Sequence, residues 1–155
     1  MSADARFEDG RDGPLNLGAF EVEDLGVISA LVQDAVFPAT EMRFVKGERR
    51  FALLLNRFRW ENGAQMQAER VQSVLAFDNV LTVASQGVSR ADKDMVLSLL
   101  SVEFIPGQAA PGGQVLLTLA GDGAIRLQVE ALEAVLRDVT RPYRAPSGKV
   151  PDHGA

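Results

Sequence analysis

Six basic side chains lie within one short stretch of the sequence, and their chemistry offers the clearest lead to a function. Residues 41–60 carry six basic and two acidic side chains, a net charge of +4, in a chain whose net charge is −5. The basic residues are Arg43, Lys46, Arg49, Arg50, Arg57 and Arg59. Because a guanidinium presents a planar fork of N–H donors, arginines of this kind suit the binding of carboxylates and phosphates.

Arg57 and Arg59 are the pair whose spacing is most specific. In a β-strand they would lie on one face about 7 Å apart, with Phe58 and Trp60 on the other face. This spacing suits a charge clamp for a phosphate or a carboxylate. The alternative is a solvated strand edge that is charged to discourage edge pairing, or a set of ion pairs with the acidic residues of 1–40.

Two residue counts restrict other chemistry. The chain has no cysteine and one histidine, His153, near its end. These counts exclude a disulfide, a cysteine nucleophile and a cysteine-ligated metal centre, and a catalytic triad with histidine would need His153. We predict no metal, no cofactor and no catalytic residue that can be named. Whether the protein is an enzyme stays open, with a non-catalytic role favoured. The remaining acid–base candidates are Glu103, Asp122, Glu130, Glu133 and Asp138.

Charge and hydropathy restrict the partners. The chain is acidic, with a pI of about 4.9, and it has one Trp and one Tyr. Nucleic-acid binding needs a basic surface with exposed aromatic side chains, so we predict none. No apolar run approaches the roughly 20 residues of a bilayer span, and the N-terminus lacks an apolar export segment. We predict a cytoplasmic location, no membrane partner, and a protein partner or a homo-oligomer.

Hydrophobic periodicity predicts one helix followed by strands. Apolar side chains repeat at helical spacing over 23–36, and Pro38 ends the pattern. The segment Phe51–Leu55 is apolar on both faces, which predicts a central strand covered on both sides. Asp78-Asn79 predicts a tight turn between two strands. Residues 132–139 fit both a helix and a strand, and we assign them to a strand. The other predicted strands cover 41–45, 49–60, 70–77, 80–86, 96–105, 114–119 and 124–131.

These elements predict an α+β fold. One N-terminal helix packs on a mostly antiparallel, curved or barrel-like sheet of about seven or eight strands. The domain covers 15–145, between a disordered leader at 1–14 and a flexible tail at 146–155. Residues 140–145 of this domain have two equally good interpretations. They are either flexible or docked back on the sheet.

A faint internal repeat suggests a duplication. Met42–Gly47 resembles Val102–Gly107, Phe51–Leu55 resembles Val115–Leu119, and Ala76–Leu81 resembles Ala131–Leu136. The order of the three segments is the same in both halves. A duplication would predict a sheet with approximate two-fold symmetry. Any two β-hairpin units resemble each other in part, so the sequence leaves open whether the chain is an internal duplication.

Longer segments resemble a known family. Arg49–Glu61, Leu17–Pro38, Leu116–Gly123 and Asp138–Tyr143 are similar to the uncharacterised bacterial domain-of-unknown-function family 2948. The resemblance covers roughly residues 14–150. It implies no activity, and it assigns no catalytic residue to this chain.

Two functional hypotheses follow. The first is a non-catalytic binding or assembly module that uses the Arg-rich strand surface or a sheet edge. Its binding residues would be Arg43, Arg49, Arg50, Arg57 and Arg59. The second is a domain that binds a small phosphate or carboxylate, or a metal-independent enzyme, with Arg57 and Arg59 as charge clamps.

Overall fold

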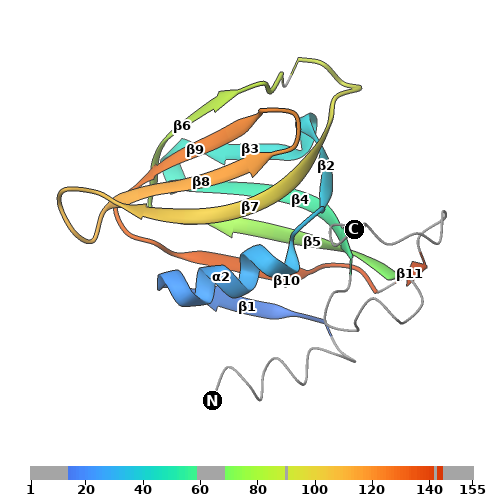
Figure 1. Cartoon of the computed structure of the whole chain (residues 1–155), viewed down its shortest axis with the longest axis horizontal. Helices are drawn as coiled ribbons and strands as arrows, with labels where there is room; N and C mark the ends of the chain where they lie inside the picture. The colour runs from blue at the N-terminus through green and yellow to red at the C-terminus, as the bar shows by residue number, and fades with distance from the viewer. Residues whose placement is uncertain (1–13, 59–68, 90, 142, 145–155) are drawn as a thin grey trace.

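The computed structural model describes residues 14–58, 69–89, 91–141 and 143–144, and in them one helix packs on an open, curved antiparallel sheet (Figure 1). The helix is α2 (Val22–Leu31), and two short 3-10 helices are η1 (Ala39–Glu41) and η2 (Lys46–Glu48). The strands are β1 (Asn16–Ala19), β2 (Val36–Pro38), β3 (Met42–Val45), β4 (Arg50–Phe58), β5 (Glu69–Phe77), β6 (Val80–Gln86), β7 (Val96–Pro106), β8 (Gly113–Leu119), β9 (Ala124–Val129), β10 (Ala134–Asp138) and β11 (Tyr143–Arg144). The predicted α+β class with a curved sheet is therefore confirmed.

The sheet has more strands than the sequence predicts. Its order is β1-β10-β5-β4-β2-β7-β8-β9-β6, with β3 beside β4 and β11 beside β5, which makes eleven strands among the described residues. The unpredicted strands β1, β2 and β11 are only two to four residues long, so they carry little hydrophobic pattern. The assignment of 132–139 to a strand is correct, since β10 covers most of it.

The helix is shorter than predicted, because the chain after it joins the sheet. Asp34 has a positive φ of 65°, and its N–H donates to the carbonyl of Leu99 at 2.8 Å. Val36 then pairs with Ser98 of β7 and with Asn56 of β4. Strand pairing therefore replaces the last predicted helical turn, and β2 joins the two parts of the sheet.

The predicted tight turn at Asp78-Asn79 exists, but it does not make a hairpin. Both edges of β5 are already paired, with β4 and with β10, so β6 cannot pair with it. Asn79 adopts a positive φ of 62°, and the chain passes from one part of the sheet to the other. There β6 pairs with β9.

The strand connectivity repeats between the two halves of the chain. β3, β4 and β5 pair in chain order, as do β7, β8 and β9. The fourth strand of each half then pairs with the third strand of the other, β6 with β9 and β10 with β5. Phe44 lies opposite Phe51 in the first hairpin, and Phe104 lies opposite Val115 in the second. These are the positions that the sequence repeat aligns, so the connectivity supports the prediction of a duplication.

The two crossing segments contact each other. The N–H of Asp78 donates to the carbonyl of Glu133 at 3.0 Å, and the N–H of Glu130 donates to the carbonyl of Asn79 at 2.9 Å. Each crossing segment therefore provides hydrogen-bond partners for backbone groups of the other. Without the second crossing, these groups would have to bond to water.

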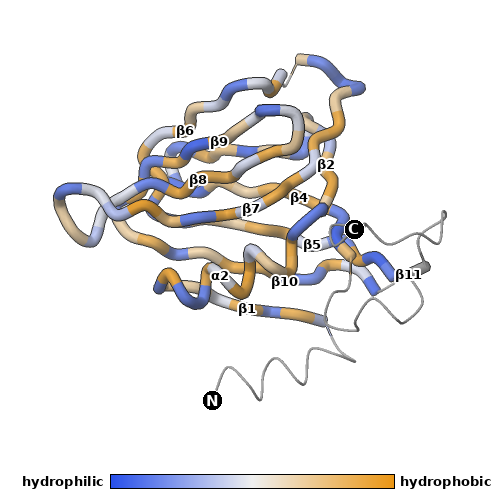
Figure 2. Tube along the Cα trace, in the orientation of Figure 1, coloured by the Kyte–Doolittle hydropathy of each residue, from blue (hydrophilic) through white to orange (hydrophobic). Residues whose placement is uncertain are grey.

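The core lies between the curved sheet and α2. Leu25, Ile28 and Leu31 of α2 are buried, and the helix packs along β7 and β1. The helix is also tied to β7 by a hydrogen bond from the N–H of Val102 to the Ser29 hydroxyl at 2.9 Å. Figure 2 shows the hydrophobic colour concentrated along α2 and the central strands. The helix therefore closes one side of the curved sheet.

A substitution of Gly113 tests how closely β7 and β8 approach. An added Cβ would lie 2.4 Å from the carbonyl oxygen of Ile105 and 2.7 Å from Cζ of Phe104. We expect Gly113→Ala to lower the free energy of unfolding, measured with urea, by about 1–3 kcal/mol. Gly26→Ala is the control. No atom lies within 4 Å of its added Cβ on α2, so we expect a gain of about 1 kcal/mol. A Gly113→Ala variant as stable as the wild type would contradict this packing.

The C-terminal segment docks back on the sheet as far as residue 144. The N–H of Gln72 donates to the Thr140 hydroxyl at 3.0 Å, and Tyr143 lies opposite Arg70. The predicted leader at 1–14, apart from Pro14, and the predicted tail at 146–155 lie outside the described residues, as does His153.

Candidate functional surface

Only part of the predicted basic cluster stays together in the structure, where Arg43 and Arg50 line one hollow. Arg43 is exposed on β3. Arg49 forms an ion pair with Glu130, and Arg50 lies 3.7 Å from Asp78. The side chain of Arg57 is fully buried, and Arg59 lies outside the described residues.

Arg57 faces the core because β4 alternates. The inward side chains of this strand are Phe51, Leu53, Leu55 and Arg57. The sequence separates Arg57 from Phe58, but both side chains are buried in the structure. The guanidinium of Arg57 therefore meets protein groups rather than solvent.

A buried hydrogen-bond network holds the guanidinium of Arg57. Nη2 donates to both carboxylate oxygens of Asp138, at 3.0 and 3.1 Å. Nε donates to the Ser73 hydroxyl at 3.1 Å, and Nη1 donates to the carbonyl of Phe58 at 3.2 Å. The side chain of Asp138 is only 2% exposed. It also accepts from the Ser73 hydroxyl at 2.7 Å and from the N–H of Leu15 at 2.9 Å.

This network joins β4, β5 and β10 to the residue that precedes β1. A buried ion pair of this kind offsets its desolvation only when its remaining donors and acceptors are bonded, as they are here. The network therefore explains Arg57 as a structural residue. Its donors are directed at Asp138, Ser73 and Phe58.

The outer face of β3, β4, β5 and β10 is different in character. Strand register aligns Arg43, Ala52, Ala76 and Val135 in one row across these strands. The next row contains Leu54, Val74 and Arg137. We call this the basic face, and define it by Arg43, Ala52, Leu54, Val74, Ala76, Val135 and Arg137.

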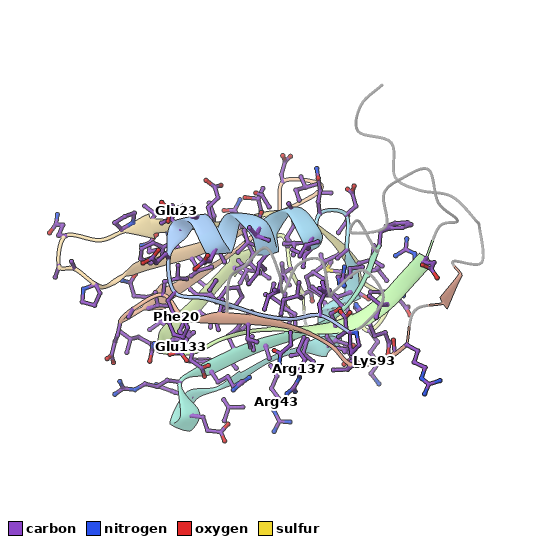
Figure 3. All side chains as sticks on the ribbon, turned by 90° about the horizontal axis from the view of Figure 1, so that it is seen from below. Phe20, Glu23, Arg43, Lys93, Glu133 and Arg137 are labelled. Atoms are coloured by element: carbon purple, nitrogen blue, oxygen red, sulfur yellow. The ribbon has the colours of Figure 1, made fainter. Side chains whose placement is uncertain are left out.

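The basic face consists of a shallow apolar strip between two arginines. Leu54, Val74 and Val135 are half-buried by their neighbours on the sheet, while Arg43 and Arg137 are exposed. In the described part of the chain, neither arginine has an ion pair. Figure 3 shows both arginines projecting from the side of the sheet away from α2, on which Glu23 is labelled.

The apolar strip corrects one expectation. The segment Phe51–Leu55 is central in the sheet, as predicted, but its outward side chains, Ala52 and Leu54, are only half-buried among the described residues. The main packing contacts of α2 are with β7 and β1 rather than with β3, β4, β5 or β10. A strand that is apolar on both faces can therefore leave one apolar face at the surface.

The second half of the chain provides an internal comparison. Glu103 lies opposite Leu116 on β7 and β8, just as Arg43 lies opposite Ala52 on β3 and β4. Arg50, on β4 beside the basic face, corresponds to Gln114 in the second half. The two halves therefore share a backbone pattern but differ in the charge of their outer faces.

One shallow hollow adjoins the basic face. It is lined by Arg43, Val45, Glu48, Arg50 and Ala52. Glu48 and the nearby Asp78, which pairs with Arg50, place negative charge beside it. This distribution disfavours a small free anion, because part of the positive charge is already compensated.

Sequence reasoning missed Arg137, Leu54, Val74 and Val135 as surface candidates. Arg137 lies about 80 residues from the basic stretch, and only the pairing of β10 with β5 brings it to the same face. The useful signal is the alternation in β10, where Val135 and Arg137 point away from buried Ala134 and Leu136.

Two further observations concern the described residues. They contain no group of three or more His, Asp or Glu side chains that could hold a metal ion. None of their helices is long and apolar enough to cross a membrane.

The described residues form an α+β fold, with one α-helix on an open, curved sheet that carries the basic face on β3, β4, β5 and β10. The chain belongs to the family described as protein of unknown function (DUF2948), whose model matches residues 15–153. No curated protein and no solved structure matches the chain.

Proposed function

We propose that the protein is a non-catalytic binding module whose basic face docks an acidic segment of a protein partner. The supporting observation is the apolar strip between Arg43 and Arg137, two exposed arginines without an ion pair in the described residues. Protein interfaces commonly combine an apolar centre with charged groups at the rim, and arginine is enriched in them. An acidic partner with apolar side chains complements both parts of this surface.

The small-anion alternative has weaker support. Its proposed clamp requires the guanidinium of Arg57, which is buried and hydrogen-bonded to Asp138. Its second member, Arg59, lies outside the described residues. The hollow near Arg43 and Arg50 also contains Glu48. We therefore retain the docking module as the proposed function.

Charge reversal tests this proposal. We expect Arg43→Glu with Arg137→Glu to reduce recovery of the protein partner from expressing cells about tenfold or more, because rim charges set encounter rates and partner choice. Glu103→Arg on the equivalent strand of the second half is the control, and it should retain the partner. Because all three sites are exposed, each substitution should change the free energy of unfolding by only about 0.5 kcal/mol.

A thermal-shift assay distinguishes the docking function from the small-anion function. Inorganic phosphate and citrate should leave the melting temperature unchanged in the wild type. A phosphate-dependent shift that disappears in Arg43→Ala would favour the small-anion function instead. Equal partner recovery by the wild type and the double reversal would overturn the docking proposal.

A further inference from the structure

Strand β6 forms one edge of the sheet. Its first residue, Val80, donates its N–H to the carbonyl of Arg49, and a β-bulge lies at Leu81. The rest of the strand carries none of the charges or prolines that usually protect an edge strand. The seven residues of β6, VLTVASQ, contain no charge and no proline. It pairs with β9, and its other edge has no partner strand in the described residues. Thr82, Ala84, Ser85 and Gln86 are exposed, so side chains on both faces of the strand reach solvent.

The opposite edge of the same sheet is protected. β1 is only four residues long and contains Gly18. It is also packed against α2, and the carboxylate of Asp138 holds the N–H of the preceding Leu15. Short, covered edge strands resist pairing, whereas a longer uncharged edge is a template for another strand. One edge of the sheet is thus blocked, and the other is available along the part of β6 that follows Val80.

We infer that β6 pairs antiparallel with β6 of a second copy of this chain, which makes a two-fold dimer with a continuous sheet. A dimer of this type uses the same surface on both copies, so the strand must be complementary to itself. With Val83 on the two-fold axis, Thr82 lies opposite Ala84, and Leu81 lies opposite Ser85. No charged side chain within β6 lies opposite another, which removes the repulsion that most exposed strands of a charged protein would meet.

The exposed side chain of Leu81 also gains a neighbour in a second copy. Leu81 is 38% exposed and lies at a β-bulge, where the register of β6 and β9 shifts. Two-fold pairing brings Leu81 of one copy opposite Ser85 of the other. The contact occurs twice, once on each side of the axis.

This dimer uses a surface different from the basic face. β6 lies at the end of the second part of the sheet, next to β9, whereas the basic face belongs to β3, β4, β5 and β10. The basic face stays open in the dimer, so each dimer presents two copies of it. The proposed docking at the basic face and the proposed dimer through β6 can therefore be disproved independently.

Cysteine scanning tests the pairing directly, because the chain has no cysteine of its own. Single cysteines at positions 82, 83, 84 and 85 of the full chain are oxidised and analysed on non-reducing gels. We expect Val83→Cys to give the most disulfide-linked dimer, since directly opposed strand residues have Cβ atoms about 4.5–5.5 Å apart. Gln128→Cys, exposed on neighbouring β9, is the control and should remain largely uncrosslinked.

Sedimentation velocity provides a second measurement. We expect the wild type to be a dimer at about 100 μM, and Ser85→Lys to raise the dissociation constant about tenfold or more. Gln128→Lys adds the same charge one strand away and should leave the dimer intact. A monomeric wild type at this concentration would overturn the inference, as would a dimer whose crosslinking has no maximum at position 83.

Discussion

Asp138→Ala is expected to lower the free energy of unfolding by about 3–5 kcal/mol, one of the two largest effects of any single substitution proposed for this protein. The variant leaves the buried guanidinium of Arg57 without its carboxylate, and it leaves the Ser73 hydroxyl and the N–H of Leu15 without their acceptor. Urea denaturation followed by circular dichroism measures the loss. Since these groups lie on four parts of the chain, the transition should also become less cooperative.

Two controls distinguish a buried network from an ordinary ion pair. Glu130→Ala removes the partner of Arg49, whose side chain is 57% exposed, and should cost less than about 1 kcal/mol. Arg57→Met combined with Asp138→Leu removes both buried charges and should cost less than Asp138→Ala alone. If Asp138→Ala and Glu130→Ala had the same effect, Asp138 would have no special structural role.

Phe37→Ala is expected to cost a similar amount, about 3–5 kcal/mol. Phe37 is fully buried on β2, the short strand that joins β4 to β7. Removing its ring leaves a cavity where the two parts of the sheet meet. Because β2 has only three residues, its hydrogen bonds alone are a weak link between them. Chemical denaturation should therefore show a large loss of stability.

Phe20→Ala provides the matched comparison. It is the same substitution at a position that is 66% exposed, just before α2. We expect a change within about 0.5 kcal/mol. A large loss at Phe20, or a small one at Phe37, would mean that the core is not organised around β2 as described.

Much of the fold can be predicted from hydrophobic patterning. The clean alternation of Ala124–Val129 identifies a strand that is buried on one face, and the apolar run Phe51–Leu55 identifies the centre of β4. Pairing is harder to predict. Asp78-Asn79 has the composition of a hairpin turn, yet β6 pairs with β9, because β10 from much later in the chain occupies the edge of β5. Such competition between distant strands leaves no local signal.

The candidate surface is less predictable for the same reason. Arg57 belongs to the basic stretch, but its role depends on Asp138, 81 residues later. Arg43 is the member of the predicted cluster that reaches the basic face as an exposed cation. Its counterpart Arg137 comes from β10, which the sequence assigns to a strand without indicating its neighbours.

Site-specific photo-crosslinking tests the basic face most directly. A photoreactive amino acid replaces Leu54 in one variant and Thr118 in another. Both residues are half-buried and point outward from β4 and β8, and the internal repeat aligns them. The docking proposal predicts a covalent adduct with a protein partner from position 54 and none from position 118. Equal adducts from both positions, or an adduct from position 118 alone, would contradict it.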